Sequence, residues 1–345
     1  MKRHTHYIRA VLLMLLPLMT VSCRKELCYN HFRAVSFNLS WEHEWERDYG
    51  MNHSGNWDSA LHGFGYDEMR PGRPEWVNLI MFAEHGPQYE TYFTSEGGDV
   101  IVDEGGGQSF LLYNGDTEYI VLSDMVSAPN ARASATGRSR ASLSVVKEIH
   151  HDARTTNPPD VIYSAYLDNV PAIGLHESRP LAVKMQPLVY TYIIRYEFEY
   201  GIQHVALARG ALGGMAESVY LRDGTTSDNS SIILYDCDIK NYGCEAHVRS
   251  FGVPGFPDKY FGQLQSKDDK QNYTLNLELR LHNGTYVEFN YDITDQIEHQ
   301  PRGGIIRVSG IRIEDSQNMS DAGFDVNVED WGDRVDIDLP VGPSN

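Results

Sequence analysis

One cysteine stands at a position where a covalent lipid is commonly attached. Lys2, Arg3 and Arg9 precede an apolar run over residues 11–19, and small residues then lead into Cys23. A basic start, a short apolar stretch and small residues before a cleavage point are typical of a secretory signal. We expect residues 1–22 to be a lipoprotein signal peptide and Cys23 to carry acyl chains such as palmitate, which bind a membrane with about 0.8 kcal/mol per buried CH₂. The alternative is plain secretion, with Cys23 an ordinary thiol.

The other cysteines could form a covalent link of a different kind. Cys237 and Cys244 flank the turn-like triplet Asn241-Tyr242-Gly243. In an oxidising compartment this spacing predicts a disulfide that closes a hairpin, with Cys28 left unpaired. Three thiols besides the lipidated one are too few for a disulfide framework or for a metal site built from two pairs of cysteines.

Signatures of catalysis are missing from the chain. It lacks the GxSxG, HExxH, GxxxxGK[ST] and GxGxxG patterns that position nucleophiles, zinc ions or phosphates. His150-His151-Asp152 could ligate a metal, and the alternating pairs Asp236/Asp238 and Asp336/Asp338 could bind calcium or act as glycosidase carboxylates. Such short groups are common by chance in an acidic chain. We therefore expect no catalytic residue, no metal, no cofactor and no enzymatic activity.

Tryptophan is concentrated near the start of the mature chain. Trp41, Trp45, Trp57 and Trp76 lie among asparagine, aspartate and histidine residues. Indole faces beside amides can grip sugar rings, so these residues are the candidate contacts of a glycan-binding surface lipoprotein. The alternative is structural, with Trp41 in the core of one strand and Trp76 at the start of the next.

Alternation of apolar and polar residues with a period of two dominates the chain and predicts strands. The best examples are the segment 34–41 with Val35, Phe37 and Leu39 facing one way, the run of aromatic and aliphatic residues over 190–200, and a hairpin that turns at Asn283-Gly284. The phase slips at Gly310, which predicts a β-bulge. Helical periodicity is not convincing anywhere in the mature sequence. The fold class is therefore all-β, with antiparallel sandwiches.

Length and composition limit the arrangement further. The chain of 345 residues has a formal net charge of −19, which repels phosphate backbones, so we expect no nucleic-acid partner. Prolines gather between residues 157 and 180, where alternation lapses. We expect two sandwich domains, residues 23–178 and 179–345, and an exposed loop over residues 131–144 in the first.

Several motifs in the chain resemble those of Bacteroidales fimbrial lipoproteins. Asn283-Gly284-Thr285, followed by Phe289 to Gln296 and by Gln300, is similar to a signature of that family, and so is the earlier segment Ala211 to Leu221. The opening Cys23 to Tyr29 and the end, Phe324 to Ile337, resemble those of one lipoprotein branch with a CRKELCY start. The matching motifs touch both halves of the chain.

The resemblance implies a fold and a function. The fold would be two tandem transthyretin-like Greek-key sandwiches, and the protein would belong to type V pili as an anchor or accessory component. In such pili an Arg-specific protease removes the first strand of a subunit, and subunits of the same family then join by strand exchange, a form of β-augmentation.

Carried onto this chain, the resemblance makes Arg47, just after the strand Ala34–Trp41, the candidate protease site. Only Pro340 to Asn345 follow the last apolar alternation, which favours an anchor or accessory protein over a stalk subunit. The expected location is the cell outer membrane, lipid-anchored through Cys23 and facing outside. The expected partners are pilus subunits and outer-membrane lipid, with room for a host or bacterial surface ligand.

Overall fold

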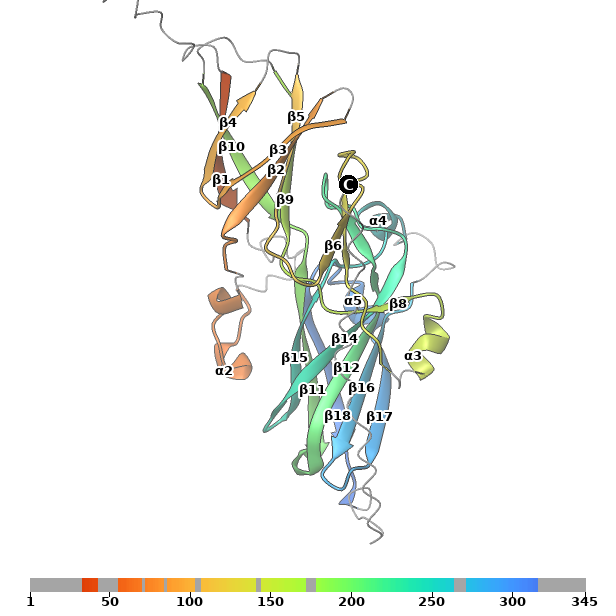
Figure 1. Cartoon of the computed structure of the whole chain (residues 1–345). Helices are drawn as coiled ribbons and strands as arrows, with labels where there is room; N and C mark the ends of the chain where they lie inside the picture. Colours follow the sequence, from red (N-terminus) through yellow and green to blue (C-terminus); the bar gives the residue numbers. More distant parts are fainter. Residues whose placement is uncertain are drawn as a thin grey trace, which may run out of the picture.

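The computed structural model describes residues 33–42, 55–69, 72–83, 86–102, 107–140, 144–171, 178–263 and 271–315. Strands fill most of these ranges, and the few helices between them are short (Figure 1). The helices are α2 (Ser59–His62), α3 (Ser144–Ile149), α4 (Asp258–Gln263) and α5 (Thr294–Ile297), with 3₁₀ turns at Tyr66–Met69 and Ile202–His204. The predicted all-β fold class is confirmed. None of the helices within the described ranges is long and apolar enough to cross a membrane.

Seven of the described strands close into a barrel in the order β1-β10-β9-β5-β2-β3-β4. They are β1 (Arg33–Trp41), β2 (Trp76–Ala83), β3 (Gly86–Thr94), β4 (Gly97–Val102), β5 (Gln108–Asn114), β9 (Tyr163–Val170) and β10 (Ser178–Pro187). Alternation places Val77, Leu79 and Leu112 inside, where all three side chains are fully buried. The barrel interior is therefore a packed hydrophobic core.

The remaining large sheet has the order β17-β16-β12-β14-β15-β11-β18, with β8 paired to β14. Its strands are β8 (Arg154–Thr156), β11 (Tyr190–Tyr200), β12 (Val205–Ala216), β14 (Ser230–Lys240), β15 (Gly243–Ser250), β16 (Thr274–Leu281), β17 (Tyr286–Asp292) and β18 (Gly304–Arg312). The aromatic face of β11 and the leucines of β16 meet in one core. The hairpin at Asn283-Gly284 and the irregular pairing at Gly310 are both confirmed.

The sequence analysis expected antiparallel sheets, but three strand pairs are parallel. β1 runs parallel to β10, β8 to β14, and β11 to β18. Parallel neighbours need a crossover connection, and each of these pairs joins strands that are far apart in the sequence. Alternation reveals which face of a strand is buried and carries no information on the direction of its neighbour.

A small third sheet, β13-β7-β6, lies where the barrel meets the large sheet. Its strands are β6 (Ile120–Ser123), β7 (Arg132–Ala135) and β13 (Ser218–Tyr220). One apolar cluster contains Ile80 and Leu111 of the barrel, Ala133 of β7, and Val219 and Phe251 from the second half. Because this cluster is continuous, the two halves are joined by a hydrophobic interface.

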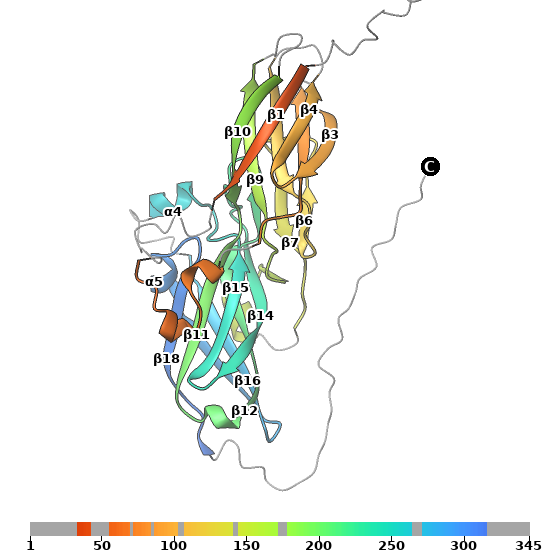
Figure 2. The ribbon, with the colours of Figure 1, turned by 90° about the vertical axis from the view of Figure 1, so that its left-hand side faces the viewer.

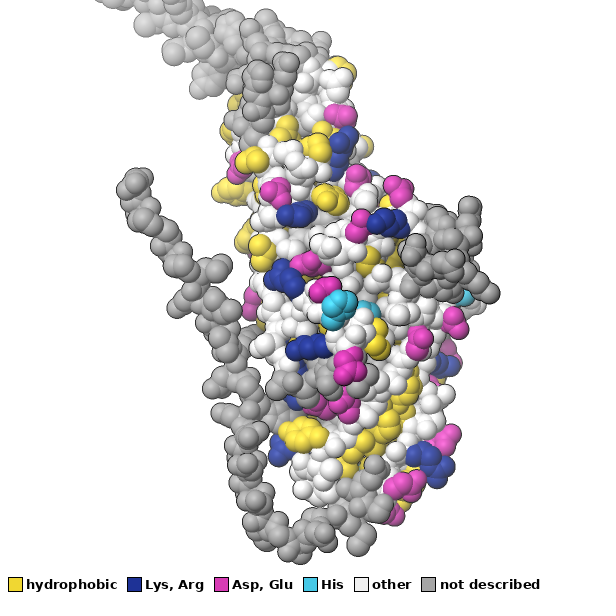
Figure 3. Space-filling model, turned by 90° about the vertical axis from the view of Figure 1, so that its right-hand side faces the viewer, with side chains coloured by type: hydrophobic (Ala, Val, Ile, Leu, Met, Phe, Trp, Pro, Cys, Tyr) yellow, Lys and Arg dark blue, Asp and Glu magenta, His cyan; other side chains and the backbone are white. Residues whose placement is uncertain are grey.

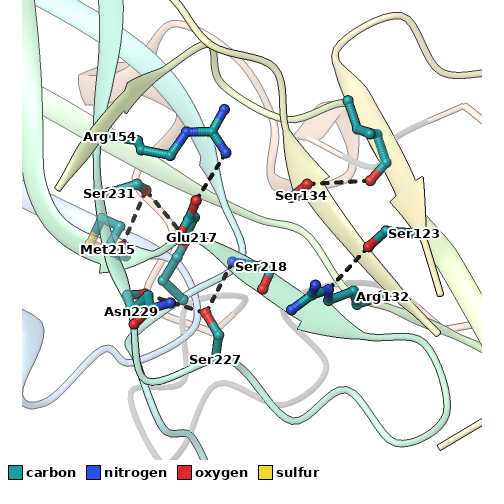
Figure 4. Close-up of polar contacts among 12 residues, drawn as sticks. Ser123, Arg132, Ser134, Arg154, Met215, Glu217, Ser218, Ser227, Asn229 and Ser231 are labelled. Carbon is teal, nitrogen blue, oxygen red and sulfur yellow. Dashed lines mark hydrogen bonds and ion pairs between the residues drawn. The ribbon is translucent and has the colours of Figure 1, made fainter. Parts of the chain in front are cut away.

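Polar contacts hold the chain around this third sheet (Figure 4). Arg154 forms a 3.0 Å ion pair with Glu217, and the Ser231 hydroxyl donates to the Met215 carbonyl at 3.2 Å. Within the sheet, the Arg132 Nε donates to the Ser123 hydroxyl at 3.0 Å. Segments from both halves of the sequence are therefore fastened to one another.

Two expectations about organisation need correction here. The segment 131–144 is not a simple exposed loop, since Ala131 and Ala133 are fully buried and β7 pairs on both sides. The expected boundary between residues 178 and 179 coincides with the first residues of β10, which pairs with β1 in the barrel. After β8, which already pairs with β14, the chain returns to the barrel in β9 and β10 and enters the large sheet again between Pro187 and Tyr190.

The two edge strands of the large sheet, β18 and β17, differ in how they are covered. On β18, the Gln300 and Gln296 side chains hydrogen-bond to the backbone N–H and C=O of Ile305 and Arg307, at 2.6–3.0 Å. Two side chains thus take the place of a neighbouring strand. On β17, core-facing hydrophobic side chains are only partly buried. A stripe of hydrophobic side chains is visible on the lower half of the molecule in Figure 3.

Candidate functional site: the first strand and its groove

Strand β1 lies between two strands that come much later in the sequence. Residues 34–41 pair in parallel with residues 178–185 of β10, and residues 33–38 pair antiparallel with residues 97–102 of β4. Figure 2 shows β1 along the barrel between these neighbours. β1 therefore completes the barrel between β4 and β10, whose other pairings are short: β4 pairs with β3 at Gly97, and β10 pairs with β9 at Gln186 and Pro187. The space between β4 and β10 that β1 fills is here called the groove.

Inward-facing side chains of β1 fill that groove. Val35 and Phe37 are 1% and 2% exposed, and Leu39 packs against the same core. The Phe37 ring stacks on Phe93 with centroids 5.8 Å apart and meets the edge of Phe110 at 5.3 Å. The expectation that these three positions face inward is confirmed. The aromatic contacts make Phe37 the central anchor of the strand.

Polar groups fasten the two borders of β1. Ser36 hydrogen-bonds to Asp99 of β4, and the Ser40 hydroxyl donates to the Val183 carbonyl of β10 at 3.3 Å. Just beyond the strand, the Glu42 carboxylate lies 3.4 Å from the Lys184 ammonium. These contacts fix the register, because a shift by one residue would turn every apolar side chain outward.

A glycine lets β4 approach β1. Gly97 has a φ of +115°, and a Cβ atom there would lie 1.8 Å from the carbonyl oxygen of Phe37. Real Cβ atoms do not come within such a distance of an oxygen, so only glycine fits. Sequence reasoning did not single out this residue, although the Gly97-Gly98 pair before an alternating segment is a signal of close backbone approach.

The candidate glycan contacts lie in different surroundings. Trp41 faces the barrel interior, where its indole meets the edge of Tyr163 at 4.9 Å and its N–H donates to the Ser95 carbonyl. Trp57 packs beside α2, outside the barrel, whereas Trp76 begins β2 and is 44% exposed. Of these three indoles, one faces the barrel core, one packs beside α2 and one is largely exposed. Trp45 lies outside the described residues, as do Cys23 and Arg47.

The predicted disulfide is not formed. Cys237 and Cys244 are free thiols, and Cys244 is paired across the β14–β15 hairpin with Ile239. This register leaves the cysteines diagonal to each other, and diagonal side chains are about 7–8 Å apart instead of the ~5 Å of directly opposite ones. Burial raises the pKa of the Cys244 thiol to about 12. The six-residue separation was compatible with a hairpin, and the register decided the geometry.

The potential metal ligands do not assemble. His150 is buried, its pKa is lowered by that burial, and its Nε2 lies 3.0 Å from the Thr274 hydroxyl, whereas the neighbouring His151 is exposed. Asp236 pairs with Arg138. Within the described ranges no group of three or more His, Cys, Asp or Glu side chains is placed to hold a metal ion. Asp336 and Asp338 lie outside the described residues.

Comparison with known proteins places the chain in a family. The profile of a family described as a domain of unknown function, DUF5119, matches residues 64–236, which is half of the 345-residue chain. This chain belongs to the DUF5119 family. The matched region includes most of the barrel and continues into β14 of the large sheet. A search of curated proteins finds no match.

Two solved bacterial structures align with most of this chain. A candidate adhesin from Bacteroides ovatus is 18% identical, with a TM-score of 0.56 over 81% of this chain and 92% of its own. The fimbrial anchor protein Mfa2 from Porphyromonas gingivalis is 10% identical, with a TM-score of 0.47 over 81% of this chain and 90% of its own. The first of these similarities shows that this DUF5119 protein and the Bacteroides ovatus protein share a fold.

Proposed function

We propose that this protein is a non-enzymatic, cell-surface lipoprotein that serves as an anchor or accessory subunit of a fimbrial fibre and joins its partners by β-strand complementation. In this proposal Cys23 holds the protein on the outer membrane, and subunits of the same family are its partners. The observation that carries the proposal is that β1 fills the groove between β4 and β10 with apolar side chains.

The energetics of β1 suit a replaceable strand. Burial of Val35, Phe37 and Leu39 contributes ~5–8 kcal/mol before the entropy of ordering the strand. Without β1, β4 and β10 would each present unpaired N–H and C=O groups along the groove. The exposed floor would include Phe93 and Phe110. Such a groove accepts another extended strand with apolar residues at alternate positions.

The shared fold adds support of a second kind. The similar structure from Bacteroides ovatus is described as a candidate adhesin, which is a cell-surface role. The signal-like start and Cys23 provide a route to the same location. Fold similarity is compatible with many functions, so the groove carries the argument.

N-terminal sequencing of the protein on intact cells separates an anchor from a polymerising subunit. A chain that begins at Cys23 retains lipid and first strand and supports an anchor. A chain that begins at Asp48 has been cleaved after Arg47 and supports a subunit whose groove is opened for assembly. A monomer whose first strand is unpaired and freely exchanging contradicts both forms of the proposal.

Strand complementation itself is testable with a peptide. A protein cleaved after Arg47 and freed from its first strand should bind a synthetic peptide of residues 33–42, measured by fluorescence anisotropy. The matched control is the same peptide with Phe37→Asp, which places a charge between Phe93 and Phe110 and should not bind. Equal binding of both peptides, or of neither, would contradict the groove.

The lipid anchor has its own test. Cys23→Ala should move the protein from the membrane fraction to the soluble fraction, while Cys28→Ala should leave it on membranes. If the Cys23 variant still sediments with outer membranes after a high-salt wash, the lipoprotein part of the proposal is wrong.

A further inference from the structure

A short segment between β1 and β2 lies on the large sheet instead of the barrel. This segment, residues 55–69, contains α2 and is here named the clasp. It packs beside β11 and β15 of the large sheet (Figures 1 and 2). The Arg195 guanidinium of β11 donates to the Leu61 carbonyl at 3.1 Å, and the Phe64 ring meets His247 of β15 with centroids 5.2 Å apart. The clasp therefore bridges the two halves of the molecule.

Local sequence explains how the clasp presents one histidine. The Asp58 carboxylate accepts hydrogen bonds from the Ala60 and Leu61 N–H groups and caps the start of α2, and Gly63 ends it with a φ of +80°. His62, the last residue of α2, is 9% exposed and stacks on the Trp57 indole with ring centroids 4.1 Å apart. The Nδ1 atom of His62 is buried without a hydrogen-bond partner.

The surroundings of His62 favour its neutral form over its protonated form. Arg195 is 2% exposed and lies under the clasp, 3.5 Å from Glu245 and 4.2 Å from the centre of the Tyr242 ring. Ionisable groups around His62 and Arg195 come from every neighbouring element: Arg195 and Glu197 on β11, Glu245 and His247 on β15, Arg307 on β18, and Asp58 in the clasp.

These groups act in opposite directions on the imidazole. Arg195 and Arg307 disfavour a proton on His62, while Glu245 and Asp58 favour one. Burial has the largest effect and also disfavours the proton. The pKa of His62 therefore lies below its ordinary value of 6.5. Glu245 does not compensate fully because it is already shared among Arg195, His247 and the Tyr242 hydroxyl.

We propose that the clasp is a pH-sensitive device, which is closed while His62 is neutral and opens from the large sheet when His62 takes up a proton. A detached clasp exposes His62 to water and separates it from Arg195, so the protonated form favours the open state. Since the pKa is lower when closed, the stability of the closed clasp is complete above about pH 6.5 and is lost as pH falls below it. The opening equilibrium should rise by up to about tenfold per pH unit through that window.

Hydrogen exchange of the full-length protein measures this opening directly. The His62 and Gly63 amides donate within α2, to Asp58 and Ser59. Because a helix of four residues is not stable without packing, these amides should exchange once the clasp leaves the sheet. Their protection factors, corrected for intrinsic exchange, should fall between pH 7.5 and pH 5. The Leu277 amide in the core of β16 is the internal reference and should keep its protection, which shows that the opening is local.

Variants identify the responsible group. His62→Gln and His62→Phe both remove the titration, and the second keeps an aromatic ring against Trp57. At least one should show clasp protection that does not change with pH. His247→Gln removes the other histidine at this interface and should still show protection that falls as pH is lowered. His151→Gln removes an exposed histidine elsewhere and should retain the wild-type pH dependence. Unchanged protection in the wild type, or loss of the response in His247→Gln alone, would overturn the proposal.

Discussion

Gly97 of β4 lies directly against the carbonyl oxygen of Phe37 in β1. A Cβ atom on residue 97 would lie 1.8 Å from that oxygen, and the φ of +115° is itself unfavourable for any side chain. The contact lies at Phe37, the most buried aromatic residue of β1. The close approach of β4 to β1 at this point therefore requires a residue without a Cβ atom.

Gly97→Ala should therefore loosen β1 without removing any apolar side chain. We expect a loss of about 1–3 kcal/mol from backbone strain alone, and further loss from displacement of β1. The matched control is Gly284→Ala, which has a φ of +86° and open space around its Cβ position. Hydrogen exchange of the β1 amides should rise in the first variant only. Equal effects of the two substitutions would show that strain, not contact, governs residue 97.

Phe37→Ala tests the filling of the groove. Removal of a buried phenylalanine side chain typically costs about 3–5 kcal/mol because a cavity remains. Asn38→Ala, on the exposed face of the same strand, should change stability by less than about 0.5 kcal/mol. The measurement is the free energy of unfolding from denaturant titration. A loss below about 1 kcal/mol for Phe37→Ala would mean that β1 is not part of the cooperative fold.

The sequence was sufficient for the strands and their buried faces. Val35 and Phe37, the aromatic face of β11 and the hairpin at Asn283-Gly284 all follow from alternation and turn chemistry, which are local. The structure also gives a role to one residue of the motif Phe289 to Gln296, because the Gln296 side chain hydrogen-bonds to the backbone of Arg307 at the edge of β18.

Long-range partners could not be predicted from the sequence. The parallel neighbours of β1 and β11, the transfer of residues 55–69 to the large sheet, and the third sheet depend on contacts between distant segments. Arg195 and Arg140 look like surface residues in a strand and a loop, yet both are buried with carboxylates. The buried His62 had no distinguishing spacing at all.

The buried Cys244 thiol and the partly buried Cys237 thiol should both be unreactive in the folded protein. Burial raises the pKa of Cys237 well above its ordinary value and that of Cys244 to about 12, so little reactive thiolate is present at pH 8. Iodoacetamide should label both only after unfolding, as measured by mass spectrometry. Because the folded pKa values are raised, the stability that these thiols contribute is complete below about pH 8.5 and is lost as pH rises further. Detection of a Cys237–Cys244 disulfide would contradict the free thiols.

The last prediction concerns a buried ion pair that fastens residues 137–140 to the large sheet. The Arg140 Nη2 lies 3.0 Å from the Glu278 carboxylate of β16, and the two side chains are only 6% and 5% exposed. Burial is the largest cause that lowers the pKa of Arg140, and the charge of Arg209 lowers it further, while Glu278 raises it by charge and by a hydrogen bond. Glu278 also bonds to Arg209 of β12, so the carboxylate joins three segments.

Arg140→Ala should cost about 3–5 kcal/mol, since it leaves Glu278 buried with less compensation. The matched control is Arg138→Ala, two residues away, whose ion pair with Asp236 is 37% and 70% exposed and should contribute less than about 1 kcal/mol. Denaturant unfolding at low and high salt separates the cases, because the buried pair is poorly screened. If the two variants lose equal stability, the attachment of this segment depends on its backbone contacts and not on the buried pair.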